Sequence, residues 1–387
     1  MNPSNSSSYL TELKNFVLLH SQAQQLDQRE VRAILETITH AEGEDAGSWC
    51  AQWFKAAERE SARQNWASAT KLYSLARFPY VETEFQQRAH EGAINSFEQS
   101  MQQAKVTFET LEIENGAFKA YATGLDKGWP LLVVCGGIVS IKEQWQRFLL
   151  LAARIKLCVV VTEMPGVGEN TLRYTPQSWA MFPQLIDAVQ GRADTRQCHL
   201  MALSFSGHLA MHAAARDPRI RGITTVGAPV ASFFRQYNTR SVPLVTRQTL
   251  SYLTGLSGES LFKQMPDWQI TQENLPPLTI PVHYLQSQFD EIIPLSEVNS
   301  LKKVARDMRL YQLADVHGSP NYMHLVAPWA LSSILSSFPS RRRQAALFRL
   351  VWQVKQFWSR RRAVRPKSPA VNHVVAAPVM ANESRSE

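Results

Sequence analysis

Six short apolar runs between residues 131 and 313 constrain the fold more than any other feature of this sequence. Helix-like segments separate most of the runs, which cover residues 131–135, 157–162, 199–203, 223–226, 282–285 and 310–313. Runs of this length without polar alternation are typical of strands buried on both faces of a parallel sheet. Because strands that alternate with helices form such a sheet, the sequence predicts an α/β domain with a mostly parallel sheet.

An antiparallel hairpin is predicted just before the first of these runs. Residues 108–114 alternate in the manner of a strand, and Asn115-Gly116 is a strong signal for a two-residue hairpin turn. Residues 117–122 follow as the returning strand. The sheet is therefore expected to begin with two antiparallel strands.

The first hundred residues are predicted to be helical. Apolar side chains recur at intervals of three and four residues, as in Val31 and Leu35, which is the spacing of an amphipathic helix. Residues 49–57 and 66–76 resemble a pair of antiparallel helices joined around Asn65. We interpret the aromatic side chains of this pair as core and not as a binding cage.

These patterns divide the chain into three predicted parts. Residues 1–104 form an N-terminal helical domain, and residues 105–340 form the α/β domain. Within the second part, the alternation of strands and helices stops over residues 235–280, which favours a cap-like insertion. Residues 341–387 form a basic amphipathic helix followed by a tail that is expected to be disordered from Pro366 onward.

The positive charge of the chain is concentrated in that last part. The 387 residues carry 41 Lys and Arg against 33 Asp and Glu, a net charge of +8. Ten of the basic residues, and no acidic residue, lie between Arg341 and Lys367. Without these ten, 31 basic and 33 acidic residues leave a net charge of −2. A nucleic-acid partner is therefore not expected.

Residues 341–362 leave two interpretations open. Apolar and aromatic residues alternate there with Arg and Lys, which suits an amphipathic helix lying on an anionic membrane or docking an acidic partner such as a carrier protein. The alternative is a terminal helix that packs on the domain with solvated arginines.

The composition also bears on the compartment. The four cysteines have neither CxxC nor CxxxC spacing, which argues against a disulfide framework or a zinc ribbon and favours a reducing compartment. The sequence shows no secretory signal, and its longest stretch without Asp, Glu, Lys or Arg, residues 316–340, has too many His, Pro and Ser residues for a membrane span. A cytoplasmic location is expected.

The sharpest local motif is Ala202-Leu203-Ser204-Phe205-Ser206-Gly207, between a predicted strand and a predicted helix. A nucleophile elbow has this small-x-Ser-x-small pattern, because the tight turn excludes bulky side chains two residues before and after the serine. Ala202 and Ser206 stand where glycines are usual, and both are small. Ser204 is therefore the candidate nucleophile, although an ordinary serine in a β-to-α turn would have the same surroundings.

A serine nucleophile needs a base, and the base needs a carboxylate that orients it. Asp290 follows the strand predicted over residues 282–285, and His317 follows the last predicted strand. Ser, then Asp, then His is the chain order of the α/β-hydrolase triad. Ser204, Asp290 and His317 are therefore predicted to be the catalytic residues.

Each role has rivals in the sequence. Glu291 is next to Asp290, His324 lies seven residues after His317, and Asp315 immediately precedes the histidine loop. His208 and His212 are four residues apart, a spacing that two metal ligands on a helix would share. No third ligand accompanies them, so packing is favoured and no metal is expected. The sequence also lacks GxGxxG, so no cofactor is expected.

The remaining site residues are predicted from loops. An oxyanion needs preorganised backbone N–H groups, and Phe205, directly after the candidate nucleophile, is expected to supply one. Ile138 or Gly137, in the loop after the first apolar run, is the candidate for the other. The loop at residues 163–169 is expected to line the pocket, with Met164 and Glu169 as substrate-binding residues.

Several of these motifs together resemble one branch of the α/β-hydrolases. The matching motifs are Gly136-Gly137 with Glu143 downstream, Met164-Pro165-Gly166-Val167-Gly168-Glu169, the serine motif, Gly227-Ala228-Pro229-Val230, and Trp66, Ala69, Tyr73, Ala76, Phe78 and Pro79 in the helical part. The branch includes the fermentation–respiration switch protein, 2,6-dihydroxypseudooxynicotine hydrolase and hydrolases that shorten aromatic polyketides. The resemblance covers roughly residues 45–340, and leaves the basic segment outside.

The resemblance implies an α/β-hydrolase fold with an N-terminal helical domain and a helical cap. It places the triad on Ser204, Asp290 and His317, with backbone donors at Phe205 and near Ile138. Polyketide-type members cleave a carbon–carbon bond in a β-dicarbonyl chain without a cofactor, which implies a small-molecule substrate, free or bound to a carrier protein. A general carboxylesterase and a non-catalytic binding protein with the hydrolase fold are the alternatives.

Overall fold

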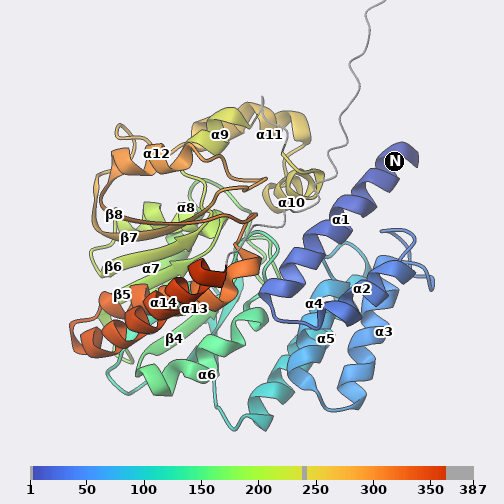
Figure 1. Ribbon diagram of the computed structural model, residues 1–387, viewed down its shortest axis with the longest axis horizontal. Helices are drawn as coiled ribbons and strands as arrows, with labels where there is room; N and C mark the ends of the chain where they lie inside the picture. The colour runs from blue at the N-terminus through green and yellow to red at the C-terminus, as the bar shows by residue number, and fades with distance from the viewer. Residues whose placement is uncertain (1–2, 238–241, 363–387) are drawn as a thin grey trace, which may run out of the picture.

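One eight-stranded sheet organises the molecule (Figure 1). The computed structural model describes residues 3–237 and 242–362. The strand order is β1-β2-β4-β3-β5-β6-β7-β8. The strands are β1 (Glu109–Ile113), β2 (Phe118–Thr123), β3 (Pro130–Cys135), β4 (Cys158–Thr162), β5 (Asp194–Ala202), β6 (Ile220–Val226), β7 (Leu278–Ser287) and β8 (Ala305–Leu313).

The sheet is antiparallel only at its N-terminal edge. β1 pairs with β2 and β2 with β4 in antiparallel fashion, whereas every other neighbouring pair is parallel. The mostly parallel sheet with an antiparallel entry is the predicted fold class, which is confirmed. The turn between β1 and β2 is longer than predicted, because Ile113 pairs with Phe118 and leaves four connecting residues. Asn115 and Gly116 lie within this turn with positive φ.

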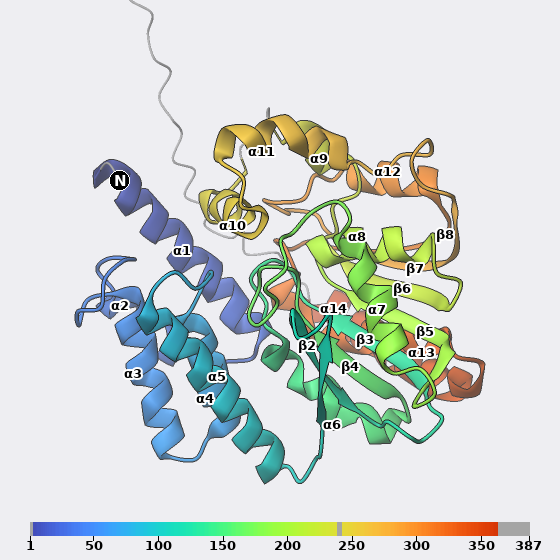
Figure 2. The ribbon, with the colours of Figure 1, turned by 180° about the vertical axis from the view of Figure 1, so that it is seen from behind.

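Helices cover both faces of the sheet (Figures 1 and 2). α6 (Gln146–Ile155), α13 (Met323–Ser336) and α14 (Arg342–Arg362) lie on one face, while α7 (Met181–Ala188) and α8 (Phe205–Ala214) lie on the other. Strand side chains alternate between two buried clusters, so Leu132 packs toward α6 and α13 and Leu131 packs toward α7 and α8. This two-sided burial explains the continuous apolar runs.

Five helices precede the sheet: α1 (Pro3–Ala23), α2 (Gln28–Thr37), α3 (Trp49–Ala62), α4 (Trp66–Ala76) and α5 (Glu84–Gln103). Side chains cap the starts of several, including Thr83, which forms a capping box with Gln86 at α5. Trp49 and Trp53 are buried, and Trp49 Nε1 donates to the carbonyl oxygen of Leu75 at 2.8 Å. These two tryptophans therefore lie in the core.

The segment between β6 and β7 contains α9 (Ser232–Gln236), α10 (Leu244–Thr254) and α11 (Gly258–Gln264), and α12 (Glu297–Val304) connects β7 to β8. The buried carboxylate of Glu297 accepts hydrogen bonds from the backbone N–H groups of Ala231, Ser232 and Phe233. It thereby fixes the start of this segment against α12. The short 3₁₀ helices are η1 (Lys142–Trp145), η2 (Ser178–Ala180), η3 (Met265–Trp268), η4 (Pro320–Tyr322) and η5 (Pro339–Arg341).

The remaining expectations concern membrane spanning, the C-terminal tail and the cysteines. Among the described residues, no helix is both long and apolar enough to cross a membrane. The tail predicted to be disordered from Pro366 lies outside the described residues. The four cysteines are buried and unpaired.

Candidate active site

Ser204 occupies a sharp turn between β5 and α8. Its backbone has φ 56° and ψ −129°, a strained conformation for a residue with a side chain. Ser204 N donates to the carbonyl oxygen of Val226 at 2.9 Å, which ties the turn to the neighbouring strand. The turn therefore has the geometry expected of a nucleophile elbow.

Small residues around the turn are required by close contacts. Ala202 and Ser206 are fully buried, and Ser206 Oγ donates to the carbonyl oxygens of Cys135 and Leu203 at 3.1 and 2.9 Å. A Cβ at Gly207 would lie only 2.3 Å from Thr225 Oγ1. A larger side chain at any of these positions would displace the turn.

The three candidate catalytic residues meet at the carboxyl ends of their strands. Ser204 Oγ lies 3.0 Å from His317 Nε2, and His317 Nδ1 lies 2.9 Å from Asp290 Oδ2. Asp290 Oδ1 also accepts from the backbone N–H groups of Ile292 and Ile293 at 3.0 and 2.7 Å. These two hydrogen bonds hold the carboxylate in place within its own loop. The side chains of Asp290 and His317 are only 3% and 15% exposed.

The rival residues have other contacts. Glu291 Oε2 accepts from the backbone N–H of His317 at 3.0 Å, and so supports the loop that carries the histidine. Asp315 accepts from the backbone and the side chain of Asn321. The ring of His324 stacks on Tyr322. Of these candidates, the structure brings only His317 to Ser204.

Charges near His317 favour its protonated form. Burial of the ring opposes protonation, but the charge and hydrogen bond of Asp290, together with the charge of Glu291, outweigh it. The pKa of His317 is therefore raised above its usual value of 6.5. An imidazole in these surroundings is a strong base toward a proton on Ser204 Oγ.

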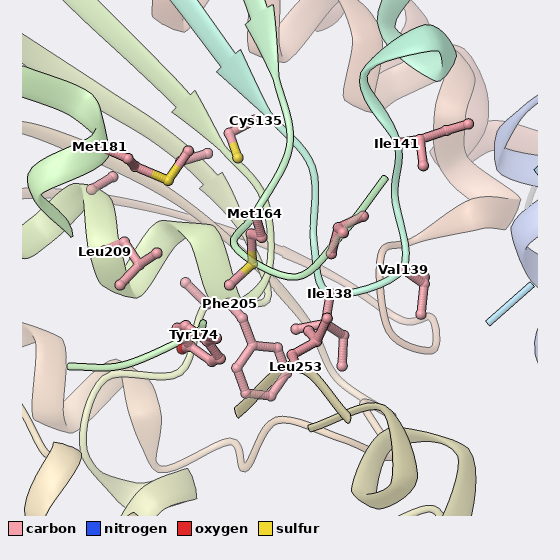
Figure 3. Close-up of a cluster of buried hydrophobic side chains, with 14 of the residues drawn as sticks. Cys135, Ile138, Val139, Ile141, Met164, Tyr174, Met181, Phe205, Leu209 and Leu253 are labelled. Atoms are coloured by element: carbon pink, nitrogen blue, oxygen red, sulfur yellow. The ribbon is translucent and has the colours of Figure 1, made fainter. Parts of the chain in front are cut away.

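The predicted oxyanion residues lie around Ser204, although their role as donors stays a prediction. Phe205 begins α8 directly after Ser204, with its side chain buried. A Cβ at Gly137 would lie 3.1 Å from Ser204 Cβ, so the loop after β3 passes against the serine. Ile138 follows in the same loop, and Figure 3 shows its side chain in the same buried cluster as Phe205.

The two predicted substrate-binding residues have contacts within the chain. Met164 is fully buried in the cluster of Figure 3. Glu169 is partly exposed and forms ion pairs with Lys119 and Lys142, at 2.8 and 2.7 Å. Contact of either residue with substrate stays a prediction.

Gly227 is a residue that the sequence analysis did not assign to the site. It has φ 59°, and a Cβ there would lie 2.8 Å from His317 Cε1 and 3.2 Å from Asp290 Oδ2. The backbone at the end of β6 is thus the surface against which the histidine ring rests. Its place after a predicted strand was the available signal.

A buried ion network lies beside the site and was also missed. Lys142, with no exposed side-chain surface, contacts Glu143, Glu163 and Glu169 at 3.0, 3.1 and 2.7 Å. Glu163 Oε1 and Oε2 accept from the backbone N–H groups of Glu169 and Lys142. The network therefore joins the loops that follow β3 and β4. The signal was Glu163, an acidic residue directly after an apolar strand.

The network shifts the pKa values of two of its carboxyl groups, those of Glu163 and Glu169, in opposite directions. Burial, with the nearby Glu143 charge, raises the pKa of Glu163 to about 7 despite Lys142. Burial also opposes ionisation of Glu169, but the charge of Lys142 and the hydrogen bond from Lys119 prevail and lower its pKa to about 2. The ion pair between Lys142 and Glu169 therefore persists at all ordinary pH values.

A small hollow of about 20 Å³, which we call the cleft, lies next to the loop after β3. Tyr80 and Tyr252 stack there, with ring centroids 4.3 Å apart, and Tyr252 Oη donates to the carbonyl oxygen of Val81. The buried guanidinium of Arg77 donates to the carbonyl oxygen of Val139. The helical part of the chain thus contacts the loop near Ser204. The cleft is lined by Arg77, Pro79, Tyr80, Val81, Ile138, Gly166, Val167, Gly168, Tyr252 and Leu253.

The histidine pair on α8 is packed within the fold. His208 Nε2 contacts the carbonyl oxygen of Trp268 at 2.9 Å, and its ring centroid lies 4.8 Å from that of His212. Across residues 3–237 and 242–362, no group of three or more His, Cys, Asp or Glu side chains could hold a metal ion.

Comparison with known sequences finds one matching family. Residues 40–275 match the family described as esterase FrsA-like. Esterase FrsA of Photorhabdus laumondii is 24% identical over 244 residues, which are 56% of this chain and 58% of that protein. Esterase FrsA of Yersinia pestis (strain Pestoides F) is 22% identical over 217 residues, 50% of this chain and 52% of that protein. The chain thus spans little more than half the length of these relatives.

Two solved structures are similar over most of the chain. AbyA5 is 38% identical with a TM-score of 0.83, covering 89% of this chain and 99% of AbyA5. The 2,6-dihydroxy-pseudo-oxynicotine hydrolase is 16% identical with a TM-score of 0.64, covering 82% of this chain and 96% of that protein, a likeness of fold. The fold, the turn at Ser204 and the match to more than half of the residues lead to one assignment: the chain belongs to the FrsA-like esterase family of α/β-hydrolases.

Proposed function

We propose that this protein is a serine hydrolase, with Ser204 as nucleophile, His317 as general base and Asp290 as the carboxylate that orients the imidazole. The observation that carries this proposal is the continuous series of contacts from Ser204 Oγ through the His317 ring to Asp290, at 3.0 and 2.9 Å. A serine hydroxyl is a weak nucleophile until a base within hydrogen-bonding distance accepts its proton. The contacts meet this requirement.

The reaction begins when Ser204 Oγ attacks a carbonyl carbon and His317 Nε2 takes the hydroxyl proton. Asp290 stabilises the imidazolium, while the backbone N–H of Phe205 and that of Ile138 or Gly137 donate to the oxyanion. Collapse of this intermediate expels an alkoxide from an ester or an enolate from a β-dicarbonyl chain, and His317 returns the proton to it. Water, deprotonated by His317, then releases the acyl group as a carboxylic acid and restores Ser204.

The proposed substrate is a polyketide-like or aromatic β-dicarbonyl compound, free or bound to a carrier protein, cleaved at a carbon–carbon bond. The resemblance to polyketide-shortening hydrolases carries this choice. Beside Ile138 the chain leaves a small hollow of about 20 Å³, bordered by the stacked rings of Tyr80 and Tyr252 and by Arg77. Cleavage of a carboxylic ester would use the same residues and is the alternative.

A fluorophosphonate probe tests whether Ser204 is a nucleophile. The wild-type protein should be labelled, and Ser204→Ala should not, while Ser257→Ala at the start of α11 should be labelled like wild type. A folded wild-type protein that never reacts would instead favour a binding protein that only has the hydrolase fold.

Product analysis separates the two bond types. The enzyme is given a β-diketone and an aryl ester in parallel, and the products are identified by mass. Release of a carboxylic acid and a shortened ketone from the diketone is the expected result. Turnover of the ester alone would refute carbon–carbon cleavage and leave a general carboxylesterase.

A further inference from the structure

The last helix of the described chain presents two different faces. On one face Ala345, Phe348 and Trp352 pack on the domain, with the Trp352 ring 5.0 Å from that of Tyr311. The Ala345 carbonyl oxygen accepts a hydrogen bond from Ser332 of α13 at 3.1 Å. These contacts fix α14 beside α13 on the sheet face that also carries α6 (Figure 1).

The other face of α14 is apolar and exposed. We call Leu347, Leu350, Val351, Val354 and Trp358 the apolar ridge, and their exposed fractions run from 37% to 58%. Their spacing of three and four residues places them on one side of the helix, opposite the packed face. Large apolar side chains exposed together in this way mark an interaction surface.

Basic side chains surround the ridge. Arg343 lies one turn before Leu347 on the same side, and Arg342, Arg349 and Lys355 are exposed along the flanks. The hydrogen bond from Arg341 to the Lys156 carbonyl oxygen, at 3.0 Å, brings the end of α6 next to the start of α14. The sequence has no Asp or Glu between Asp315 and Glu383, so α13 and α14 carry no negative side chain.

We propose that α14 is a membrane-surface helix, whose apolar ridge inserts among anionic phospholipids while its basic flanks contact their headgroups. An in-plane helix of this kind needs an apolar side bordered by Lys and Arg, and α14 has both. Long basic side chains at the flanks reach the headgroups while their stems remain against the apolar layer. The match to the FrsA-like family ends at residue 275, so the surface belongs to a part of the chain outside that match.

The size and shape of the ridge favour a membrane over a protein partner. From Leu347 to Trp358 the ridge is about 17 Å long and roughly 10 Å wide, since an α-helix rises about 1.5 Å per residue. The ridge has five residues, whereas each partner of a stable protein interface contributes about 20–30 residues and buries roughly 800 Å² of accessible surface. A lipid surface has no such minimum, because each inserted side chain adds to binding independently.

Vesicle binding by the full-length protein tests the proposal. Vesicles of phosphatidylcholine and phosphatidylglycerol in equal parts should bind the wild-type protein, and added salt should weaken binding. Vesicles of phosphatidylcholine alone should bind much less. No binding to the mixed vesicles, or equal binding to both kinds, would overturn the proposal.

Matched variants locate the contact. Leu350→Glu should weaken vesicle binding about tenfold or more. The variant loses a leucine that inserts among the lipids in this proposal, and it adds a negative charge. Leu295→Glu, which changes a leucine of similar exposure outside α14, should bind like wild type. Arg343→Gln with Arg349→Gln should also weaken binding, whereas Arg32→Gln with Lys55→Gln should not. If Leu350→Glu binds like wild type, the ridge is not the contact.

Three further measurements separate folding and other occupants from lipid binding. Leu350→Glu should keep wild-type thermal stability and hydrolysis of a water-soluble ester. Sedimentation velocity should give the same mass for both proteins. A dimer that Leu350→Glu dissociates, or binding to an acidic carrier protein with no binding to vesicles, would assign the ridge to that partner and overturn the membrane proposal.

Discussion

The carboxyl edge of the sheet and the outer face of α14 each depart from one half of a common rule. In most proteins charged side chains are exposed and large apolar side chains are buried. At the sheet edge, charged groups are buried, as with Lys142 and the carboxylate of Asp290. On α14, large apolar groups such as Leu350 are exposed. In the first region Lys142 has carboxylate partners inside the chain and Asp290 accepts hydrogen bonds from His317 and from the backbone, whereas the second region is bordered by charges of one sign.

The difference indicates where each region finds its partners. A buried charge is costly unless the fold supplies an opposite charge and hydrogen bonds, so the sheet edge must be complete within the folded protein. An exposed apolar side chain carries little cost for folding, and the surface of α14 can remain ready for a partner outside the chain. The two regions should therefore respond to substitution in different assays.

Ser204→Ala should have the largest effect of the variants considered. Loss of a serine nucleophile lowers kcat by about 10⁴ to 10⁶, because the residues of a triad act as a unit. Vesicle binding should be unchanged, while Leu350→Glu should show the reverse pattern. If either variant changes both ester hydrolysis and vesicle flotation, the two regions do not act separately.

Lys142→Met tests whether the buried charges depend on each other. Removing this ammonium group leaves carboxylates buried without their partner, which should lower the free energy of unfolding by about 3–5 kcal/mol. Lys119→Met removes a lysine that is 34% exposed and should cost about 1 kcal/mol or less. Urea unfolding of both variants measures the difference, and equal values would mean that burial does not determine the role of Lys142.

The two faces of α14 can be separated in the same way. Trp352→Ala should lower the free energy of unfolding by about 1–3 kcal/mol, because its half-buried ring packs on Tyr311. Leu350→Ala should change it by about 0.5 kcal/mol or less, since its side chain is exposed. Thermal unfolding compares them, and a large loss of stability in Leu350→Ala would show that the ridge supports the fold.

The sequence predicted the centre of the sheet better than its margins. Buried strands appear as apolar runs, but β8 begins at Ala305, five residues before the predicted run. The missed part of this edge strand contains Arg306, Asp307 and Arg309, which are exposed or half-buried. β5 also begins earlier, at Asp194, where a register shift separates its first residues from the main pairing with β3. Polar residues in paired but exposed positions resemble loop residues in a sequence.

Part of the site could be anticipated because parallel strands bring their carboxyl ends to one edge. That rule placed Ser204, Asp290 and His317 close together, and their contacts agree with it. The Lys142 network and the contact of Arg77 with the loop after β3 depend on how separate elements pack. The spacing of residues in the sequence does not predict such contacts between separate elements.

The smallest expected effect concerns the pH dependence of hydrolysis. The general base that we propose, His317, acts in its neutral form, and its pKa is raised partly by the charge of Glu291. We therefore expect kcat/KM to fall as the pH drops through that raised value. Glu291→Gln removes a charge that stabilises the imidazolium, so the pKa of His317 should fall and the acidic limb should move to lower pH. Arg349→Gln, on α14, should leave the limb in place. A limb that stays fixed or moves upward in Glu291→Gln would mean that the charge of Glu291 does not act on His317, and that the sheet edge is less tightly coupled than its contacts indicate.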